Sequence, residues 1–469
     1  MILALGGLTV AVHLPGLAFR LFNSDEASLA SIAMVLNRGG RLYHQTADRK
    51  PPVVPYLYST IFRVTGNTDI RPVRALAIVA LAVTACLLAA EAGRRYQSRR
   101  AALACGVLFS LGVVTFFPPD TQAAGFEIFM LLPMTAAVVA AGRGRAVQAG
   151  LWLAVACLCK QTAITTALPV AFLLVRTRGW QSCLRAAGAG GALVLATAVF
   201  FGPARFLLWT VTGNGGYLAL RGSAMATVWR GLVMTGSFVG LNVALAALCA
   251  WAAARHRVGP DLWLWLASGF IGVVAGARFF GHYYLQLYPP LALIATAALI
   301  GLPRRARRAV LALVVAMAMA TAAAAGVFPP TERGVLPYGA LAAKVRSLTR
   351  RSDRIFIWGQ YPELYWASRR EPATRFIQTG FITGNSGGRP PAGATPDEGI
   401  PGAWSMLEAD FATTPPELVV DTSPARIRGS QYYPLSRSRL WSTIQGRYEL
   451  AATLEGVAFY RRIPTPAPG

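Results

Sequence analysis

The chain has 469 residues, of which 54% are hydrophobic and only 14% are charged. A soluble domain carries about 25% charged residues, so the composition excludes an ordinary soluble protein and indicates one embedded in a membrane. The net charge of +25 would suit a nucleic-acid-binding protein, but the arginines lie largely between apolar runs, where the positive-inside rule accounts for them, and we expect no nucleic acid partner.

Apolar runs long enough to cross a bilayer recur from the first residue to about residue 327. The first run has neither a positively charged start nor a small-residue cleavage site, so we expect it to stay in the protein as a span. The pattern predicts an all-α multi-pass membrane domain of about eleven helices, near residues 1–21, 72–92, 101–117, 125–142, 146–159, 161–175, 184–202, 228–254, 260–277, 284–302 and 309–327.

The charges in the linkers predict the orientation of these spans. Alternate linkers carry arginine clusters, which places them in the cytoplasm; the clusters are Arg94, Arg95, Arg99 and Arg100; Arg143 and Arg145; Arg176, Arg178 and Arg185; Arg255 and Arg257; Arg304, Arg305, Arg307 and Arg308. The remaining linkers, including the long first loop 22–71, then face outside. Glu91 and Asp261 depart from a pattern in which most acids of the membrane half lie outside. We predict a plasma-membrane protein whose C-terminal part is extracytoplasmic.

The C-terminal part differs in texture from the membrane domain, which we place at 1–327. Residues 328–469 are rich in Arg, Pro, Gly and Thr, and the stretch 383–401 is typical of a loop. We expect a small soluble α/β domain, with strands at 354–358, 375–377, 418–420 and 457–460 and helices at 362–368 and 403–412.

The first outer loop carries two adjacent acids, Asp25 and Glu26, directly after the first span. The segment 27–36 that follows is amphipathic enough to lie along the membrane interface. A carboxylate held there can act as a general base. The acids could instead only cap a helix, because Asn23 and Ser24 precede a helical pattern. We favour function, because adjacent helical residues point in different directions and a cap needs only one of them.

Cations and further acids follow at the same face. Lys50 precedes two prolines, which push it towards an extended conformation, although a lysine at this depth can also simply extend to lipid headgroups. Asp120 lies in the second outer connector, and Glu127 begins the next span, where the helix dipole alone would favour an acid. Lys160, between two short spans, is a buried cation that requires an anion.

A third cluster reads Arg278-Phe-Phe-Gly-His-Tyr-Tyr-Leu-Gln. Arg278 offers a planar donor fork that suits phosphate, and His282 and Tyr283 can add hydrogen bonds. An aromatic belt with one anchoring arginine explains the same residues equally well.

Together these residues match one kind of chemistry. Transfer of a sugar from a lipid phosphate requires cations that stabilise the phosphate leaving group and a carboxylate that takes the proton from the attacking hydroxyl. The six cysteines lack the spacing and histidine companions of a zinc site. We therefore expect no bound metal.

With these motifs the chain resembles GT-C fold glycosyltransferases of the protein O-mannosyltransferase and aminoarabinose-transferase type, as in glycosyltransferase families 39 and 83. The resemblance covers roughly residues 1–300, and its motifs are Asp25-Glu26, Lys50-Pro51-Pro52, Asp120-Thr-Gln with Glu127, and Arg278 to Tyr284. It implies a polyprenyl-phosphate sugar as donor, inversion at the anomeric carbon and no required cofactor.

The resemblance also implies roles for single residues. Asp25 takes the catalytic position, Lys50 contacts the carrier phosphate, and Asp120 and Glu127 shape the sugar and acceptor site. Members of the family often have an acid immediately before Lys-Pro-Pro, whereas this chain has Arg49 there and Asp48 one residue earlier. That difference bears on donor or acceptor preference.

We therefore predict a transferase that moves a sugar, such as mannose, another hexose or a pentose, to a hydroxyl on a protein, lipid or glycan acceptor outside the plasma membrane. Asp25 is the expected base, with Glu26 and Asp120 supporting it. Lys50 and Arg278 are expected to hold the phosphate, with Lys160 and His282. A flippase for lipid-linked sugars or another transporter remains an alternative, as does a scaffold that only binds glycolipid.

Overall fold

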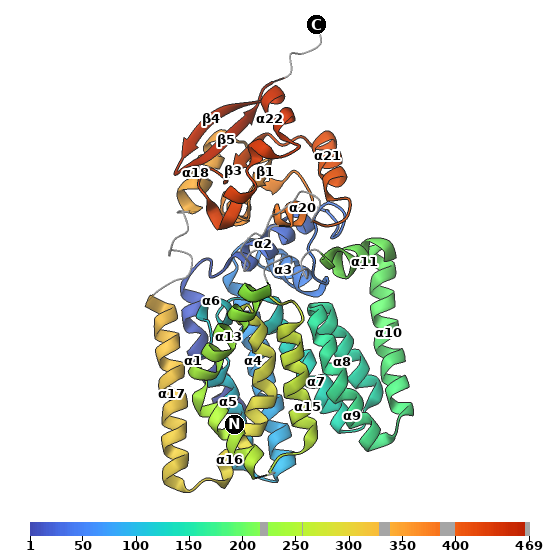
Figure 1. Ribbon diagram of the computed structural model, residues 1–469, viewed down its shortest axis with the longest axis vertical. Helices are drawn as coiled ribbons and strands as arrows, with labels where there is room; N and C mark the ends of the chain where they lie inside the picture. Colours follow the sequence, from blue (N-terminus) through green and yellow to red (C-terminus); the bar gives the residue numbers. More distant parts are fainter. Residues whose placement is uncertain (216–223, 256, 328–337, 385–398, 465–469) are drawn as a thin grey trace.

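The computed structural model describes residues 1–215, 224–255, 257–327, 338–384 and 399–464. A bundle of helices forms one end of an elongated molecule, an α/β unit forms the other, and α2 and α3 lie between them (Figure 1). The bundle contains α1 (Ile2–Ala18), α4 (Arg71–Tyr96), α5 (Arg99–Gly112), α7 (Phe126–Gly142), α8 (Ala146–Cys159), α9 (Ala167–Arg178), α10 (Gln181–Phe201), α13 (Ala224–Leu241), α14 (Val243–Ala254), α15 (Pro260–Val274), α16 (Tyr288–Gly301) and α17 (Arg304–Val327).

Shorter elements connect the bundle to the α/β unit. These are α2 (Ser24–Asn37), α3 (Val53–Thr65), α6 (Pro118–Thr121), α11 (Pro203–Thr210) and the 3₁₀ segments η1 (Gln161–Thr166), η2 (Thr212–Asn214) and η3 (Gly281–Leu287). The helix α2 begins next to Asp25, η1 begins next to Lys160 and η3 begins next to His282. These elements therefore position the polar side chains that the sequence singled out.

Each predicted span falls on helical residues of the bundle, and the span predicted at 228–254 consists of α13 and α14, which meet at Asn242. Among the described residues, five helical stretches are long and apolar enough to cross a membrane: Arg71–Tyr96, Gln181–Phe201, Ala224–Leu241, Gly281–Gly301 and Arg304–Val327. The predicted helical membrane domain is therefore confirmed, while the number of eleven spans stays a prediction.

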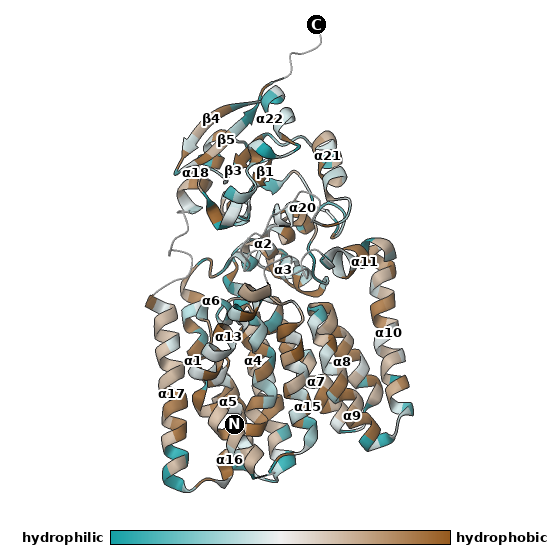
Figure 2. Ribbon diagram, viewed as in Figure 1, coloured by the Kyte–Doolittle hydropathy of each residue, from teal (hydrophilic) through white to brown (hydrophobic). Residues whose placement is uncertain are grey.

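The arginine-rich linkers lie at the end of the bundle away from the α/β unit, which we call the basal end and which is hydrophilic in Figure 2. The two acids that departed from the predicted charge pattern also lie there. Glu91 pairs with Arg94 at 2.5 Å and with Arg95 at 2.7 Å, and Arg95 also reaches Asp261 at 2.6 Å. These acids neutralise arginines, which explains why they occur among positive charges.

The α/β unit contains a five-stranded sheet in the order β2-β1-β3-β5-β4. β1 is parallel to β2 and β3, and β5 is antiparallel to β3 and β4. Its elements are α18 (Tyr338–Leu348), β1 (Arg354–Trp358), α19 (Glu363–Ser368), β2 (Glu371–Pro372), α20 (Gly380–Thr383), α21 (Ala403–Thr413), β3 (Leu418–Asp421), η5 (Ile427–Tyr432), η6 (Leu435–Arg437), α22 (Trp441–Arg447), β4 (Tyr448–Leu454) and β5 (Val457–Arg462).

Three of the four predicted strands are confirmed, as are both predicted helices. The strand predicted at 375–377 is wrong, because the chain forms β2 four residues earlier. Phe376 and Ile377 are buried in the core without joining the sheet, and Arg375 binds Asp410 instead. β4 was not predicted, because its side chains are mostly exposed. Most of the predicted loop 383–401 lies outside the described residues.

The helix α2 is buried on both sides, so the expectation that 27–36 lies along the membrane interface is wrong. Leu29 and Ala33 belong to the core of the bundle, whereas Ile32 and Leu36 belong to the core of the α/β unit. The Oγ of Ser28 accepts a hydrogen bond from Gln378 Nε2 at 2.7 Å. The α/β unit covers the face of α2 that would otherwise meet the interface. Because α2 is packed between the two cores, the positions of Asp25 and Glu26 in its first turn are fixed.

Candidate active site

A cavity of about 790 Å³ lies where the bundle, the first loop and the α/β unit meet. Six of the nine predicted site residues line it: Asp25, Lys50, Asp120, Lys160, His282 and Tyr283. They come from five separate segments of the chain. Glu26, Glu127 and Arg278 are not among its lining residues.

Asp25 lies in the first turn of α2, where the side chain of Asn23 accepts hydrogen bonds from the Asp25 and Glu26 amides. The Asp25 carboxylate lies 3.9 Å from Lys50 Nζ, and its side chain remains 36% exposed because it faces the cavity. Burial opposes ionisation of Asp25, but the charges of Lys50 and His282 outweigh it, and the pKa of Asp25 is lowered. Asp25 is therefore ionised and able to accept a proton at neutral pH.

Lys50 is held at the cavity by its neighbours. Tyr43 donates a hydrogen bond to the Lys50 carbonyl at 2.7 Å, and the prolines that follow lead into α3. The ammonium lies 4.3 Å from the centre of the Phe126 ring, in a cation–π contact. Because the side chain is 27% exposed towards the cavity, Lys50 can still meet an anion there.

A second group of charged residues also borders the cavity. His282 Nδ1 lies 3.0 Å from Asp120 Oδ2, which also accepts from the His282 amide at 2.9 Å. His282 Nε2 lies 3.5 Å from Glu127, and Glu127 forms a close ion pair with Lys160. The Lys160 ammonium is 3.8 Å from the centre of the Tyr283 ring. Asp120 and Glu127 thus orient His282 and Lys160, whose side chains line the cavity.

Glu26 lies at the side of α2 that faces away from the cavity, and its expected catalytic role is not supported. Its oxygens accept from Arg74 Nε and Nη2, both at 2.7 Å, and from the Ala124 amide at 2.8 Å. Glu26 also accepts from the Phe22 and Asn23 amides and completes the helix cap. Both partners of the ion pair are buried, with 0–1% of their side chains exposed. Glu26 anchors α2 to the bundle.

Arg278 is 3% exposed and does not line the cavity, although Gly276 and Phe280 on either side of it do. Ala277 and Phe279 both have left-handed backbone conformations, with φ of 48° and 49°. Arg278 lies between these two left-handed residues. Its carbonyl accepts a hydrogen bond from Arg230 Nε at 2.7 Å. The expected direct contact between Arg278 and a phosphate is therefore not supported.

The α/β unit adds an arginine that the sequence did not single out. Arg428 lines the cavity and donates to the Oγ of Ser24 at 2.8 Å and, as a fork, to Glu363 at 2.6 and 3.0 Å. Ser24 and Arg428 are 404 residues apart in the chain, and no local motif marks Arg428. The residue could be found only from the folded structure.

Asp48 and Arg49, at the position where the sequence departs from the family motif, also line the cavity. Burial raises the pKa of Asp48, against the charge of nearby Lys50. Arg49 donates to the Gly380 carbonyl at 3.1 Å and lies over the Phe381 ring. Arg49 therefore attaches the first loop to the α/β unit.

Within the described ranges no group of three or more His, Cys, Asp or Glu side chains could hold a metal, and a metal-free reaction stays a prediction.

Comparison with known proteins places this geometry in context. Residues 49–209, which include Lys50, Asp120, Glu127 and Lys160, match the family model of dolichyl-phosphate-mannose-protein mannosyltransferase. A comparison with curated protein sequences gives no match.

Solved structures resemble the whole chain. ArnT from Cupriavidus metallidurans superposes with a TM-score of 0.64 when bound to undecaprenyl phosphate, at 16% identity over 100% of this chain and 99% of that one. Its apo form gives 0.67, at 14% identity over 98% of each chain. The Archaeoglobus fulgidus oligosaccharyltransferase, in complex with Zn and sulfate, gives 0.53 at 12% identity, over 98% of this chain and 73% of that one.

At these identities the structural likeness shows a common fold. The family match over residues 49–209 supports the reaction class, which the sequence had predicted from motifs inside and outside that range. The chain has the GT-C fold, and its resemblance to membrane glycosyltransferases that depend on a lipid-linked sugar is confirmed.

Proposed function

We propose that the chain is an inverting transferase that moves a sugar from a polyprenyl-phosphate carrier to a hydroxyl acceptor on the outer face of the plasma membrane. One observation supports it above others: a cavity holds an ionised carboxylate, Asp25, 3.9 Å from a lysine ammonium, Lys50. The cavity also contains His282 and Lys160, which supply further positive charge. This is the pairing that the transfer requires.

In the proposed reaction the acceptor oxygen attacks the anomeric carbon from the side opposite the phosphate. The new carbon–oxygen bond forms as the bond from the anomeric carbon to the phosphate oxygen breaks, which inverts the configuration. The phosphate leaves on the carrier lipid with the bonding electron pair. Asp25 takes the proton of the acceptor hydroxyl.

Lys50 and His282 stabilise the charge that develops on the leaving phosphate. Asp120 holds His282 in orientation through Nδ1, so Asp120 is a positioning residue. Lys160 contributes positive charge next to Tyr283, while Glu127 keeps that lysine in place. Glu26 and Arg278 act through the fold, since neither lines the cavity.

The proposed sidedness follows from the charges. The basal end carries the arginine clusters, so it is placed in the cytoplasm, and the cavity and the α/β unit are then outside. We expect the eleven predicted spans all to cross the membrane, with α13 and α14 together forming one of them. One related structure contains undecaprenyl phosphate, and the A. fulgidus enzyme has been solved with dolichol-phosphate and an inhibitory peptide. Both support a lipid carrier for this chain.

The function is tested with purified protein in liposomes that contain radiolabelled polyprenyl-phosphate sugars, presented one at a time with membrane extract as acceptor. We expect label to pass from the carrier into a new covalent product, with free polyprenyl phosphate released in equal amount. Boiled protein is the control. Sugar that crosses the bilayer while still attached to its carrier would show a transporter instead.

Replacement of Lys50 by Gln should weaken donor binding and change the pH dependence. Loss of one charge-assisted contact should raise KM for the donor about tenfold or more. The Lys50 charge also lowers the pKa of Asp25 against the effect of burial. Without that charge the pKa of Asp25 rises. Because Asp25 must be ionised to act as base, the loss of activity on acidification should begin at a higher pH than in the unmodified enzyme.

The measurement is kcat/KM as a function of pH for both proteins. Arg41→Gln is the matched control, because Arg41 is an exposed cation of the same loop that does not line the cavity. An acidic limb at the same pH in the Lys50→Gln protein would contradict the assigned coupling between Lys50 and Asp25.

A further inference from the structure

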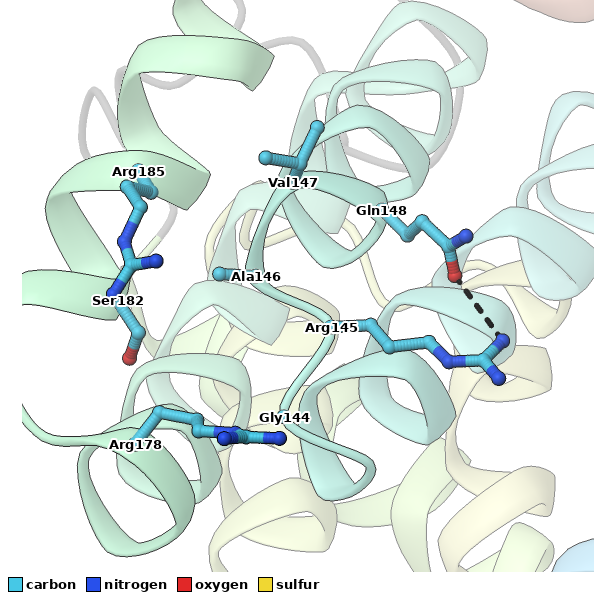
Figure 3. Close-up of a pocket in the computed structure, with 8 residues that line it drawn as sticks. All are labelled: Gly144, Arg145, Ala146, Val147, Gln148, Arg178, Ser182 and Arg185. Carbon is cyan, nitrogen blue, oxygen red and sulfur yellow. Dashed lines mark hydrogen bonds between the residues drawn. The ribbon is translucent and has the colours of Figure 1, made fainter.

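A second cavity, of about 420 Å³, lies at the basal end, far from the candidate active site. It is formed by the loop before α8, the first turn of α8, the end of α9 and the start of α10 (Figure 3). Three arginines line it, Arg145, Arg178 and Arg185, and no acidic residue does. A hollow with this lining has the charge of an anion site.

The arginines of this cavity differ from their neighbours at the same end. Arg94, Arg95 and Arg143 share the carboxylates of Glu91 and Asp261. In the part of the chain that the structure describes, Arg178 and Arg185 have no such partner, and Arg145 only reaches Gln148, at 3.5 Å. The charge around the cavity is therefore left uncompensated by the protein.

The backbone holds these groups together. Gly150 of α8 and Gly190 of α10 allow the two helices to touch, since a Cβ on Gly150 would lie 2.0 Å from the Ala186 carbonyl. Gly144 has φ +67°, and the Arg178 side chain lies against it, as Figure 3 shows. α8 begins without a side-chain cap, so its first amides add partial positive charge beside the arginines.

Apolar side chains flank the charged hollow. Val147 and Leu151 of α8 are 50% and 39% exposed, and Trp180 at the N-cap of α10 and Leu184 within it are 64% and 60% exposed. In a membrane protein, such a surface at a helix end meets lipid chains and the headgroup boundary. A free phosphate or nucleotide would use the arginines but would have no use for the apolar flank.

We propose that this cavity binds the phosphate headgroup of an anionic phospholipid from the leaflet at the basal end. Arg178 and Arg185 contact the phosphate, and the acyl chains lie along α8 and α10. Basic hollows between membrane helices are suited to this class of ligand. The site is separate from the candidate active site and does not depend on the proposed transferase activity.

The test measures lipids that stay bound to the purified protein, by native mass spectrometry after exchange into mixed micelles with equal phosphatidylglycerol and phosphatidylcholine. We expect retained phosphatidylglycerol to exceed phosphatidylcholine. The double variant Arg178→Gln, Arg185→Gln should lower phosphatidylglycerol retention about tenfold or more. The control double variant Arg305→Gln, Arg308→Gln removes two exposed arginines of the same end outside the cavity, and it should retain the lipid as the unmodified protein does.

Three results would overturn the proposal. Equal loss of lipid in both double variants would show general attraction to basic residues, and unchanged retention in the cavity variant would show that the lipid binds elsewhere. Displacement of the lipid by glycerol phosphate at equal concentration would show a site for soluble phosphates. Thermal unfolding of both variants near that of the unmodified protein establishes that the comparison concerns folded molecules.

Discussion

Replacement of Asp25 by Asn should abolish sugar transfer while donor binding is retained. The amide keeps the shape of the side chain but cannot take a proton, and loss of a general base costs about 10²–10⁴ in kcat. The helix cap survives, because Asn23 makes it through its own side chain. The donor phosphate meets Lys50 and His282, which are unchanged, so KM for the donor should change little.

The measurement is initial rate as a function of donor concentration, with bound polyprenyl phosphate quantified separately. Asp69→Asn is the matched control, since Asp69 is an acid of the same loop that pairs with its neighbour Arg71 and does not line the cavity, and it should keep near-normal rates. Full activity of the Asp25→Asn protein would remove Asp25 from the role of base.

Replacement of Glu26 by Gln should destabilise the protein strongly, although the residue is next to Asp25. Arg74 would keep its charge in a site where only 1% of its side chain is exposed, and removal of one partner of a buried ion pair costs about 3–5 kcal/mol. The side-chain NH2 of the new glutamine would also face the Ala124 backbone N–H or the Arg74 guanidinium. Both of these groups are donors to Glu26 in the native protein. The unfolding temperature should fall, while kcat per folded molecule should stay within a few-fold.

The double variant Glu26→Gln, Arg74→Met separates structure from catalysis. It removes both charges, so it should recover part of the lost unfolding temperature. Normal stability of Glu26→Gln, together with a loss of kcat as large as that of Asp25→Asn, would instead assign Glu26 to the chemistry.

The sequence predicted those parts of the molecule that depend on local pattern. Apolar runs marked the helical segments of the bundle, and arginine clusters marked the basal end, because hydropathy and charge are properties of short windows. Asp25 and Lys50, which the sequence assigned to one site, lie 3.9 Å apart.

Parts that depend on distant partners could not be predicted. Adjacent residues of α2 point about 100° apart, and Glu26 faces the bundle because its partners there are Arg74, 48 residues away, and the Ala124 amide, 98 residues away. Arg278 does not line the cavity, and the residues on both sides of it have left-handed backbone conformations, with φ of 48° at Ala277 and 49° at Phe279, which the sequence does not indicate. Arg428 reaches Ser24 across 404 residues.

The burial of α2 between two cores has a consequence for how the enzyme is made. Ser31 contacts Pro362 across 331 residues, and Ser28 is bound by Gln378 across 350. Most of the chain must therefore be synthesised before the contacts that hold α2, and with it Asp25, can form. A nascent or truncated chain that ends in the membrane domain would contain Asp25 but not its finished surroundings, so we expect activity to begin only once synthesis is nearly complete.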